Sequence, residues 1–217
     1  MQLSAPGSDA SLDPVADVLF LLEWRRRIAE LYAEIREAPD PQIAWRRWHE
    51  TRARLFREHP QSPIPAAQRP DYAGPHLFAY DPAWRVTASV EPVEAGRFEL
   101  ATSNVEVMAF NRFGRARFTA AGRDLSLELY WLEGYGGGLF LPFADATSGT
   151  ETYGAGRYLL DTVKGADLGQ PDGRLLLDFN FAYPPSCSYD PRWTCPLAPP
   201  ANRLSTPVRA GERLALA

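Results

Sequence analysis

The chain of 217 residues is short of cysteine, lysine and histidine: it has two Cys, three His and, among 23 basic residues, one lysine, Lys164. Two cysteines are too few for the disulfide framework that stabilises small secreted domains. The histidines lack the spacing of a zinc motif, and we expect neither a metal nor a cofactor. A formal net charge of −4 provides no basic face, so we expect no nucleic-acid partner.

Long apolar runs and catalytic motifs are also missing. The run from Val15 to Leu22 is much shorter than the roughly 18 apolar residues that span a bilayer. Residues 1–9 lack the basic start of a secretion signal, so we expect a cytoplasmic protein with no membrane partner. The sequence has no Walker-type phosphate loop, dinucleotide fingerprint, nucleophile elbow or His-Glu-x-x-His helix, so no standard motif assigns a reaction.

The first quarter of the chain has a helical pattern. Residues 1–12 are small and polar, which predicts a disordered tail. Asp13 followed by Pro14 is a typical helix start, and apolar residues then recur at helical spacing. A second helix is predicted from about residue 42 to residue 58, bounded by prolines on both sides. We therefore expect a helical hairpin over residues 13–60.

After a proline-rich connector, the apolar period changes from helical to two, which indicates half-buried strands. Glycines between these segments mark turns, and no helical pattern separates them. The expected fold is mainly β (α+β): a curled antiparallel sheet or small barrel over residues 61–217, forming one structural unit with the hairpin. Strands are predicted at 85–91, 104–108, 115–120, 124–132, 139–143, 157–162 and 175–180.

The segment 141–160 is dense in polar side chains on turns. Asp145, Thr147, Thr150 and Tyr153 lie among glycines, and Arg157 follows at the start of a strand. Such a loop can direct amides and hydroxyls at one anion, and a rigidly held arginine suits a carboxylate or phosphate. The alternative is structural: Asp145 caps the turn and Arg157 ties the loop to the sheet.

The segment 175–183 ends a strongly apolar strand with polar side chains. Asp178 and Asn180 are two residues apart, so on a strand they share one face. That face is either a pocket or the solvent side of the sheet. Tyr183 follows directly, at the start of the proline-rich loop.

The two cysteines, Cys187 and Cys195, are separated by seven residues. They are compatible with a disulfide, with a zinc site that needs two further ligands, or with a reactive thiol whose pKa Arg192 lowers. The fourth alternative is two free cysteines that pack a proline-rich loop. Nucleophilic catalysis by Cys187 with a histidine requires His76 to lie on this loop.

Two long stretches carry a family resemblance: LPFADATSGTETYGAGRYLLD at 141–161 and LLLDFNFAYPPSCSYDPRWTCPLAPPANRLSTPVRAGE at 175–212, with HPQSPIP at 59–65 upstream. The chain resembles, from about Trp24 onward, the uncharacterised bacterial and archaeal proteins of the domain-of-unknown-function 1684 family. The family has no assigned activity, so the resemblance implies no catalytic residue. It does imply that a set of residues forms a signature: Asp145, Thr147, Gly149, Thr150, Tyr153, Gly156, Arg157, Tyr158, Asp178, Asn180, Tyr183, Cys187, Cys195, Pro196, Asn202, Gly211 and Glu212.

Two hypotheses follow. In the first, the loops 145–157 and 183–195 meet at a mouth of the sheet and bind a small polar or anionic molecule. Its candidate ligand-binding residues are Thr147, Thr150, Tyr153, Arg157, Asn180 and Tyr183, and its candidate catalytic residues are Asp145, Asp178 and Cys187. In the second, the protein is a structural or partner-binding module, and its C-terminal motif is a folding device. Aromatic residues on the hairpin, Trp45 and Trp48, pack either on the sheet or on a second copy in a homodimer.

Overall fold

The computed structural model describes residues 13–105 and 107–215, and it begins with the expected hairpin of helices α1 (Pro14–Glu37) and α2 (Pro41–Glu58). Asp13 caps α1 by accepting a hydrogen bond from the amide of Val15 at 3.2 Å. A proline occupies the first turn of both helices, where its missing N–H costs nothing. The predicted tail, residues 1–12, lies outside the described residues. Among the described helices, none has the length and apolar character needed to cross a membrane.

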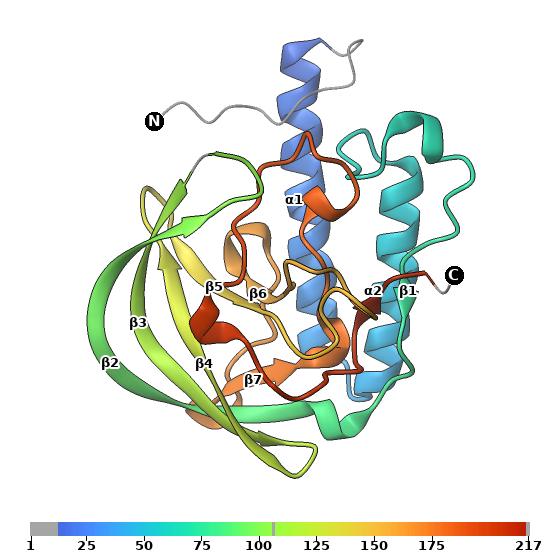
Figure 1. Cartoon of the computed structure of the whole chain (residues 1–217). Helices are drawn as coiled ribbons and strands as arrows, with labels where there is room; N and C mark the ends of the chain where they lie inside the picture. The colour runs from blue at the N-terminus through green and yellow to red at the C-terminus, as the bar shows by residue number, and fades with distance from the viewer. Residues whose placement is uncertain (1–12, 106, 216–217) are drawn as a thin grey trace.

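Six antiparallel strands form the main sheet in the order β6-β5-β4-β3-β2-β7. Figure 1 shows this sheet curling around the C-terminal part of the chain, with the two helices beside it. A two-stranded sheet pairs the start of the β-rich part with the end of the chain. The fold is therefore mainly β (α+β), a nearly closed barrel with an N-terminal helical hairpin, as predicted. The strands are β1 (His76–Leu77), β2 (Arg85–Ala101), β3 (Val107–Ala120), β4 (Arg123–Leu132), β5 (Gly138–Phe143), β6 (Arg157–Asp161), β7 (Leu175–Asp178) and β8 (Glu212–Arg213).

The two edge strands of the sheet are joined by the segment that follows β7. The amide of Tyr158 on β6 donates to the carbonyl of Tyr183 at 2.8 Å, and the Tyr183 amide donates back at 3.1 Å. This pairing satisfies backbone groups that an open sheet edge would leave exposed. It brings Tyr183 and β6 together, although they are distant in sequence.

Several predicted strands differ in their bounds. The predicted strand 85–91 extends to Ala101 in β2, and the predicted strands 104–108 and 115–120 are parts of the one strand β3. Val105, expected on a strand, is fully exposed before β3 begins at Val107, because Thr102 Oγ1 accepts from the Asn104 amide and forms a turn. The predicted strand 175–180 ends at Asp178, whose side chain accepts from the Asn180 amide at 3.0 Å. That hydrogen bond begins a short 3-10 helix, so Asn180 is not on the strand.

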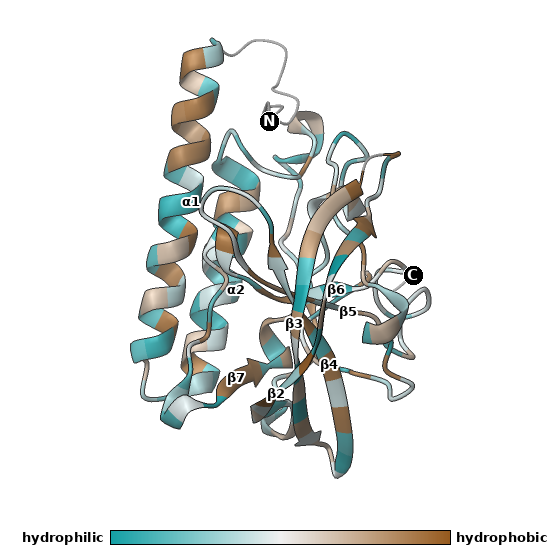
Figure 2. Cartoon of the chain, turned by 90° about the vertical axis from the view of Figure 1, so that its left-hand side faces the viewer, coloured by the Kyte–Doolittle hydropathy of each residue, from teal (hydrophilic) through white to brown (hydrophobic). Residues whose placement is uncertain are grey.

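The hairpin packs against the barrel as a separate layer, which Figure 2 shows in side view. Trp48 on α2 is completely buried and lies edge-on to Phe181, with ring centroids 5.4 Å apart. Trp45 packs on Tyr80 with centroids 5.8 Å apart. Both tryptophans therefore contact the protein's own β-rich part, which is the first of the two alternatives that the sequence left open.

Candidate functional site

Arg157, the predicted anion-binding residue, is buried at the start of β6 with 1% of its surface exposed. Its Nη1 donates to the carbonyls of Ala210 and Glu212, and its Nη2 donates to the Asp145 carboxylate and the Val208 carbonyl at 2.9 Å each. Burial lowers the pKa of Arg157, and the Asp145 carboxylate opposes this effect. Protein groups thus use its Nη donors, which favours a structural role for this residue.

The Asp145 carboxylate organises the same loop from within. Its Oδ1 accepts from the Thr147 amide at 2.8 Å, from Thr147 Oγ1 at 2.6 Å and from the Val208 amide at 3.0 Å. Thr147 Oγ1 also contacts Thr152 Oγ1 at 2.9 Å, and Thr150 Oγ1 donates to the Thr147 carbonyl at 3.0 Å. These partners make the threonines part of the loop's own hydrogen-bond network.

Asp178 and Asn180 form a second buried group, away from the hydrogen bonds of Arg157. Asn180 Nδ2 donates to Asp178 Oδ1 at 2.8 Å and to the Asp81 carbonyl at 2.9 Å, while Arg85 Nη1 donates to Asp178 Oδ2 at 2.8 Å. Burial raises the pKa of Asp178, and the hydrogen bonds from Arg85 and Asn180 oppose this shift. The group joins β7 to the segment before β2.

The loops 145–157 and 183–195 touch each other. One contact between them joins the Tyr153 hydroxyl and Cys187 Sγ, which are 3.8 Å apart. Cys187 and Cys195 are both free thiols, so the structure does not contain the disulfide alternative. Among residues 13–105 and 107–215, no cluster of three or more His, Cys, Asp or Glu side chains is arranged to hold a metal ion.

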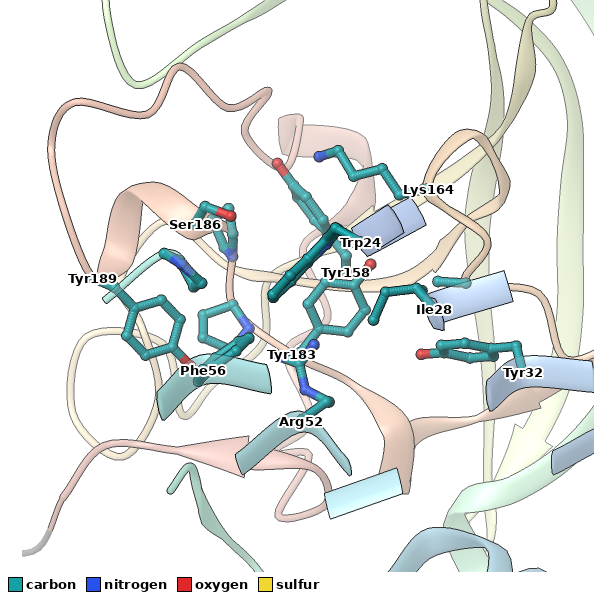
Figure 3. A pocket seen from close by; sticks show the side chains of 14 residues that line it. Trp24, Ile28, Tyr32, Arg52, Phe56, Tyr158, Lys164, Tyr183, Ser186 and Tyr189 are labelled. Atoms are coloured by element: carbon teal, nitrogen blue, oxygen red, sulfur yellow. The ribbon is translucent and has the colours of Figure 1, made fainter. Parts of the chain in front are cut away.

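A pocket lies where the hairpin faces β6 and the loop after β7. Its volume is about 60 Å³, and its mouth opens to solvent. Figure 3 shows its side chains converging from α1, α2 and the loop after β7. Two cationic side chains, Arg52 and Lys164, also line it. Its aromatic lining residues are Trp24, Tyr32, Phe56, Tyr158, Tyr183 and Tyr189.

Arg52 lies on the helical side of the pocket and is fixed by a buried carboxylate. Its Nη2 is 2.7 Å from Glu212 Oε1, and the Tyr189 hydroxyl donates to Glu212 Oε2 at 2.7 Å. The guanidinium carbon lies 4.7 Å from the ring centroids of both Phe56 and Tyr183, within the range of a cation–π interaction. Arg52 thus joins the hairpin to the end of the family signature.

Lys164 is at the solvent side of the pocket. Its Nζ is 3.3 Å from Asp161 Oδ2, and half of its side chain, 51%, remains exposed. The Asp161 charge raises the pKa of Lys164, while the charge of Arg25 on α1 opposes the shift. The ammonium is therefore charged at neutral pH and accessible to solvent.

The tyrosines of the pocket are neutral at physiological pH. Burial raises the pKa of Tyr158, Tyr183 and Tyr189 well above the ordinary value, and burial also raises that of Tyr32. The pocket consequently contains hydroxyl groups but no phenolate.

Of the predicted ligand-binding residues, only Tyr183 lines this pocket. The sequence analysis did not predict Trp24 and Arg52 as site residues, because the helical pattern of the hairpin already explains the presence of an aromatic and a charged residue at these positions. The usable signals were an arginine between the aromatic residues Trp48 and Phe56 on α2, and the presence of a single lysine, Lys164, in an arginine-rich chain.

The fold and this site define a class: a small barrel-like β protein with a helical hairpin and an aromatic pocket between them. The family described as "Protein of unknown function (DUF1684)" matches residues 70–213, and the chain belongs to this family. The solution NMR structure of the uncharacterized protein from gene locus rrnAC0354 of Haloarcula marismortui is 36% identical, with a TM-score of 0.57. That match covers 76% of this chain and 90% of the archaeal one. No curated protein matches the chain.

Proposed function

We propose that this protein binds a small molecule that combines one aromatic ring with an anionic group, such as an aromatic carboxylate. The observation that carries the proposal is the convergence of six aromatic side chains and two cations on one pocket. Binding sites for small molecules commonly combine apolar and aromatic walls with a few oriented polar groups.

The aromatic walls suit a flat ring. Trp24 is stacked on Phe56, with centroids 6.1 Å apart and planes 15° apart, so their relative orientation is fixed. The backbone of Tyr183, another lining residue, is held by its pairing with β6. A planar ligand between such walls buries apolar area and makes offset-stacked or edge contacts.

The cations suit an anionic group. An ammonium has three donors, and Asp161 takes one donor of Lys164, which leaves donors for a ligand carboxylate at the mouth. The positive charge of Arg25 lies nearby. Arg52 adds charge from within the protein, although Glu212 already pairs with it.

In this proposal the predicted residues divide into two roles. Tyr183 contacts the ligand, while Arg157, Thr147, Thr150 and Asn180 hold the frame around it. Through the carbonyl of Glu212, Arg157 fixes the residue that orients Arg52. The cytoplasmic location expected from the sequence is part of the proposal, and a reducing compartment suits the two free thiols.

The single lysine provides a local probe of binding. Reductive methylation with ¹³C-formaldehyde labels Lys164 and the chain's amino terminus, and no other side chain of the sequence. The expected result is that benzoate shifts the Lys164 resonance at lower concentration than benzamide, which lacks the charge, or acetate, which lacks the ring. An equal response to acetate and benzoate, or no response to benzoate at millimolar concentration, would overturn the proposal.

Matched variants distinguish the contribution of the ligand's ring to binding from that of its charge. Binding of benzoate and benzamide to each variant is measured by calorimetry. Trp24→Leu should weaken binding of both probes, and Lys164→Gln should weaken binding of benzoate alone. Trp131→Leu is the control, because Trp131 is 48% exposed and does not line the pocket. If Trp131→Leu weakens binding as much as Trp24→Leu, the probes bind elsewhere.

A further inference from the structure

Cys187 and Cys195 form a pair of thiols that ligand binding in the pocket does not use. Cys187 lies on the 3-10 helix Ser186–Ser188, and Cys195 lies eight positions further along the chain. Both are free, and their side chains are hydrogen-bonded to each other. The fold therefore holds two reduced sulfur atoms side by side.

The two thiols differ in their surroundings. Cys195 is buried, with 3% of its surface exposed, and it is fixed to the end of β2: its amide donates to Ser103 Oγ at 3.1 Å, and its carbonyl accepts from the Ser103 amide at 2.9 Å. Cys187 is only partly buried, and the Tyr153 hydroxyl lies 3.8 Å from its sulfur. Cys187 is therefore the less buried of the two thiols, and Cys195 is the one held in place by Ser103.

We propose that Cys187 and Cys195 are a thiol–disulfide exchange site, in which Cys187 attacks a low-molecular-weight disulfide and Cys195 resolves the product. The Cys187 thiolate attacks one sulfur of the disulfide RSSR, forms a Cys187–S–S–R bond and releases RS⁻. Cys195 then loses its proton to the released thiolate, and its sulfur attacks the sulfur of Cys187. The S–SR bond breaks and the second RS⁻ leaves, taking up a proton from solvent. The protein dithiol is oxidised to a disulfide, and RSSR is reduced to two RSH.

The charge distribution supports this order of attack. Hydrogen bonds from Cys195, Ser103 and Tyr153 lower the pKa of Cys187 to about 6, so the thiolate is its favoured form at pH 7. The hydrogen bond to Cys187 and burial raise the pKa of Cys195, while the Lys164 charge opposes this shift. The less buried sulfur is thus the nucleophile, and the buried one stays protonated until the mixed disulfide forms.

Glutathione disulfide is a direct probe for the test. The full-length protein, reduced and freed of reductant, is incubated with excess glutathione disulfide and analysed by intact mass and peptide mapping. The expected product is a Cys187–Cys195 disulfide that carries no glutathione, preceded at early times by one glutathione on Cys187. Two other products would overturn the proposal: a protein that stays reduced, or one that accumulates glutathione on Cys195.

Two variants identify the role of each thiol. Cys195→Ser should stop at a stable mixed disulfide on Cys187, since no second thiol resolves it, and Cys187→Ser should take up glutathione at least tenfold more slowly. Equal uptake by the two variants would contradict the assigned roles. If a variant does not fold, the early mixed disulfide in the unmodified protein gives the same answer, because its position shows which sulfur attacked first.

Discussion

Arg157 and Asp145 form an ion pair that is closed to solvent, with Nη2 2.9 Å from Oδ2. The pair lies between the start of β6 and the loop after β5, and both of its members bind the same C-terminal residue: the Val208 amide donates to Asp145, and the Val208 carbonyl accepts from Arg157. The pair therefore fixes the segment that precedes β8.

Arg157→Ala should destabilise the fold strongly. The substitution leaves the Asp145 carboxylate buried without a counter-charge and removes the donors to the Val208 and Ala210 carbonyls. Removing one partner of a buried ion pair costs about 3–5 kcal/mol. Urea unfolding followed by tryptophan fluorescence measures the loss.

Arg209→Ala is the matched control for this prediction. Arg209 pairs with Glu151 of the same loop, but both side chains are exposed to solvent. Exposed ion pairs contribute little to stability, so the unfolding midpoint should hardly change. Equal losses in the Arg157 and Arg209 variants would show that burial does not decide the role of the pair.

The Arg52–Glu212 pair predicts non-additive stability changes. Arg52→Met leaves Glu212 buried and unpaired, which should cost about 3–5 kcal/mol. Adding Glu212→Gln removes that charge, so the double variant should be more stable than the Arg52→Met single variant. A double-mutant cycle by chemical denaturation measures the coupling, and strictly additive losses would contradict it.

Gly211→Ala should be more costly than Gly122→Ala. Both glycines have positive φ, +78° and +71°, so each substitution carries the strain of a left-handed conformation, about 1–2 kcal/mol. At Gly211 the new Cβ would also lie 2.5 Å from the Ala182 carbonyl oxygen and 2.7 Å from that of Phe179, whereas Gly122 has open space. We expect an additional loss of about 1–3 kcal/mol at Gly211, measured by thermal unfolding. Equal effects would show that the backbone moves aside.

Alkylation of Cys187 by iodoacetamide should depend on pH with an inflection near 6. The thiolate is the reactive form, so the rate should rise as the pH passes through about 6 and level off above neutrality. An ordinary cysteine has a pKa near 8.5 and would still be gaining reactivity at pH 8. Peptide mass spectrometry of timed samples gives the rate.

Tyr153→Phe tests the cause of that inflection. The groups that face the two thiols are Ser103, Tyr153, Tyr158 and, near Cys195, Lys164. Removing the Tyr153 hydroxyl deletes one hydrogen bond to the Cys187 sulfur, so the inflection should move to higher pH. An inflection near 8.5 in the unmodified protein would contradict the stabilised thiolate.

Local signals accounted for the elements that the sequence predicted well. Asp13 and Asp40 cap the two helices through their own side chains, and residues 121–122 have the two positive φ angles of a tight hairpin between β3 and β4. Each signal acts within a few residues. The same reasoning failed at Asn180, because the capping hydrogen bond of Asp178 ended the strand despite its apolar alternation.

The candidate site depended on contacts that no local pattern contains. Arg157 looks like an anion-binding residue in its own loop, but the carbonyls that use its donors come from residues 208–212, about fifty positions later. The pocket similarly combines Trp24 and Arg52 from the hairpin with Tyr183 from the loop after β7.

The sequence by itself determined the helical hairpin, the antiparallel β-rich part and the stretches that form the family signature, because capping, turn formation and alternation are short-range effects. The tertiary structure decided which of those polar residues face inward. The barrel is closed by the pairing of Tyr158 with Tyr183. Arg157, paired with Asp145, belongs to the frame of the fold, whereas Arg52, paired with Glu212, lines the pocket. That difference depends on burial and on the position of a counter-charge, and both are properties of the folded chain.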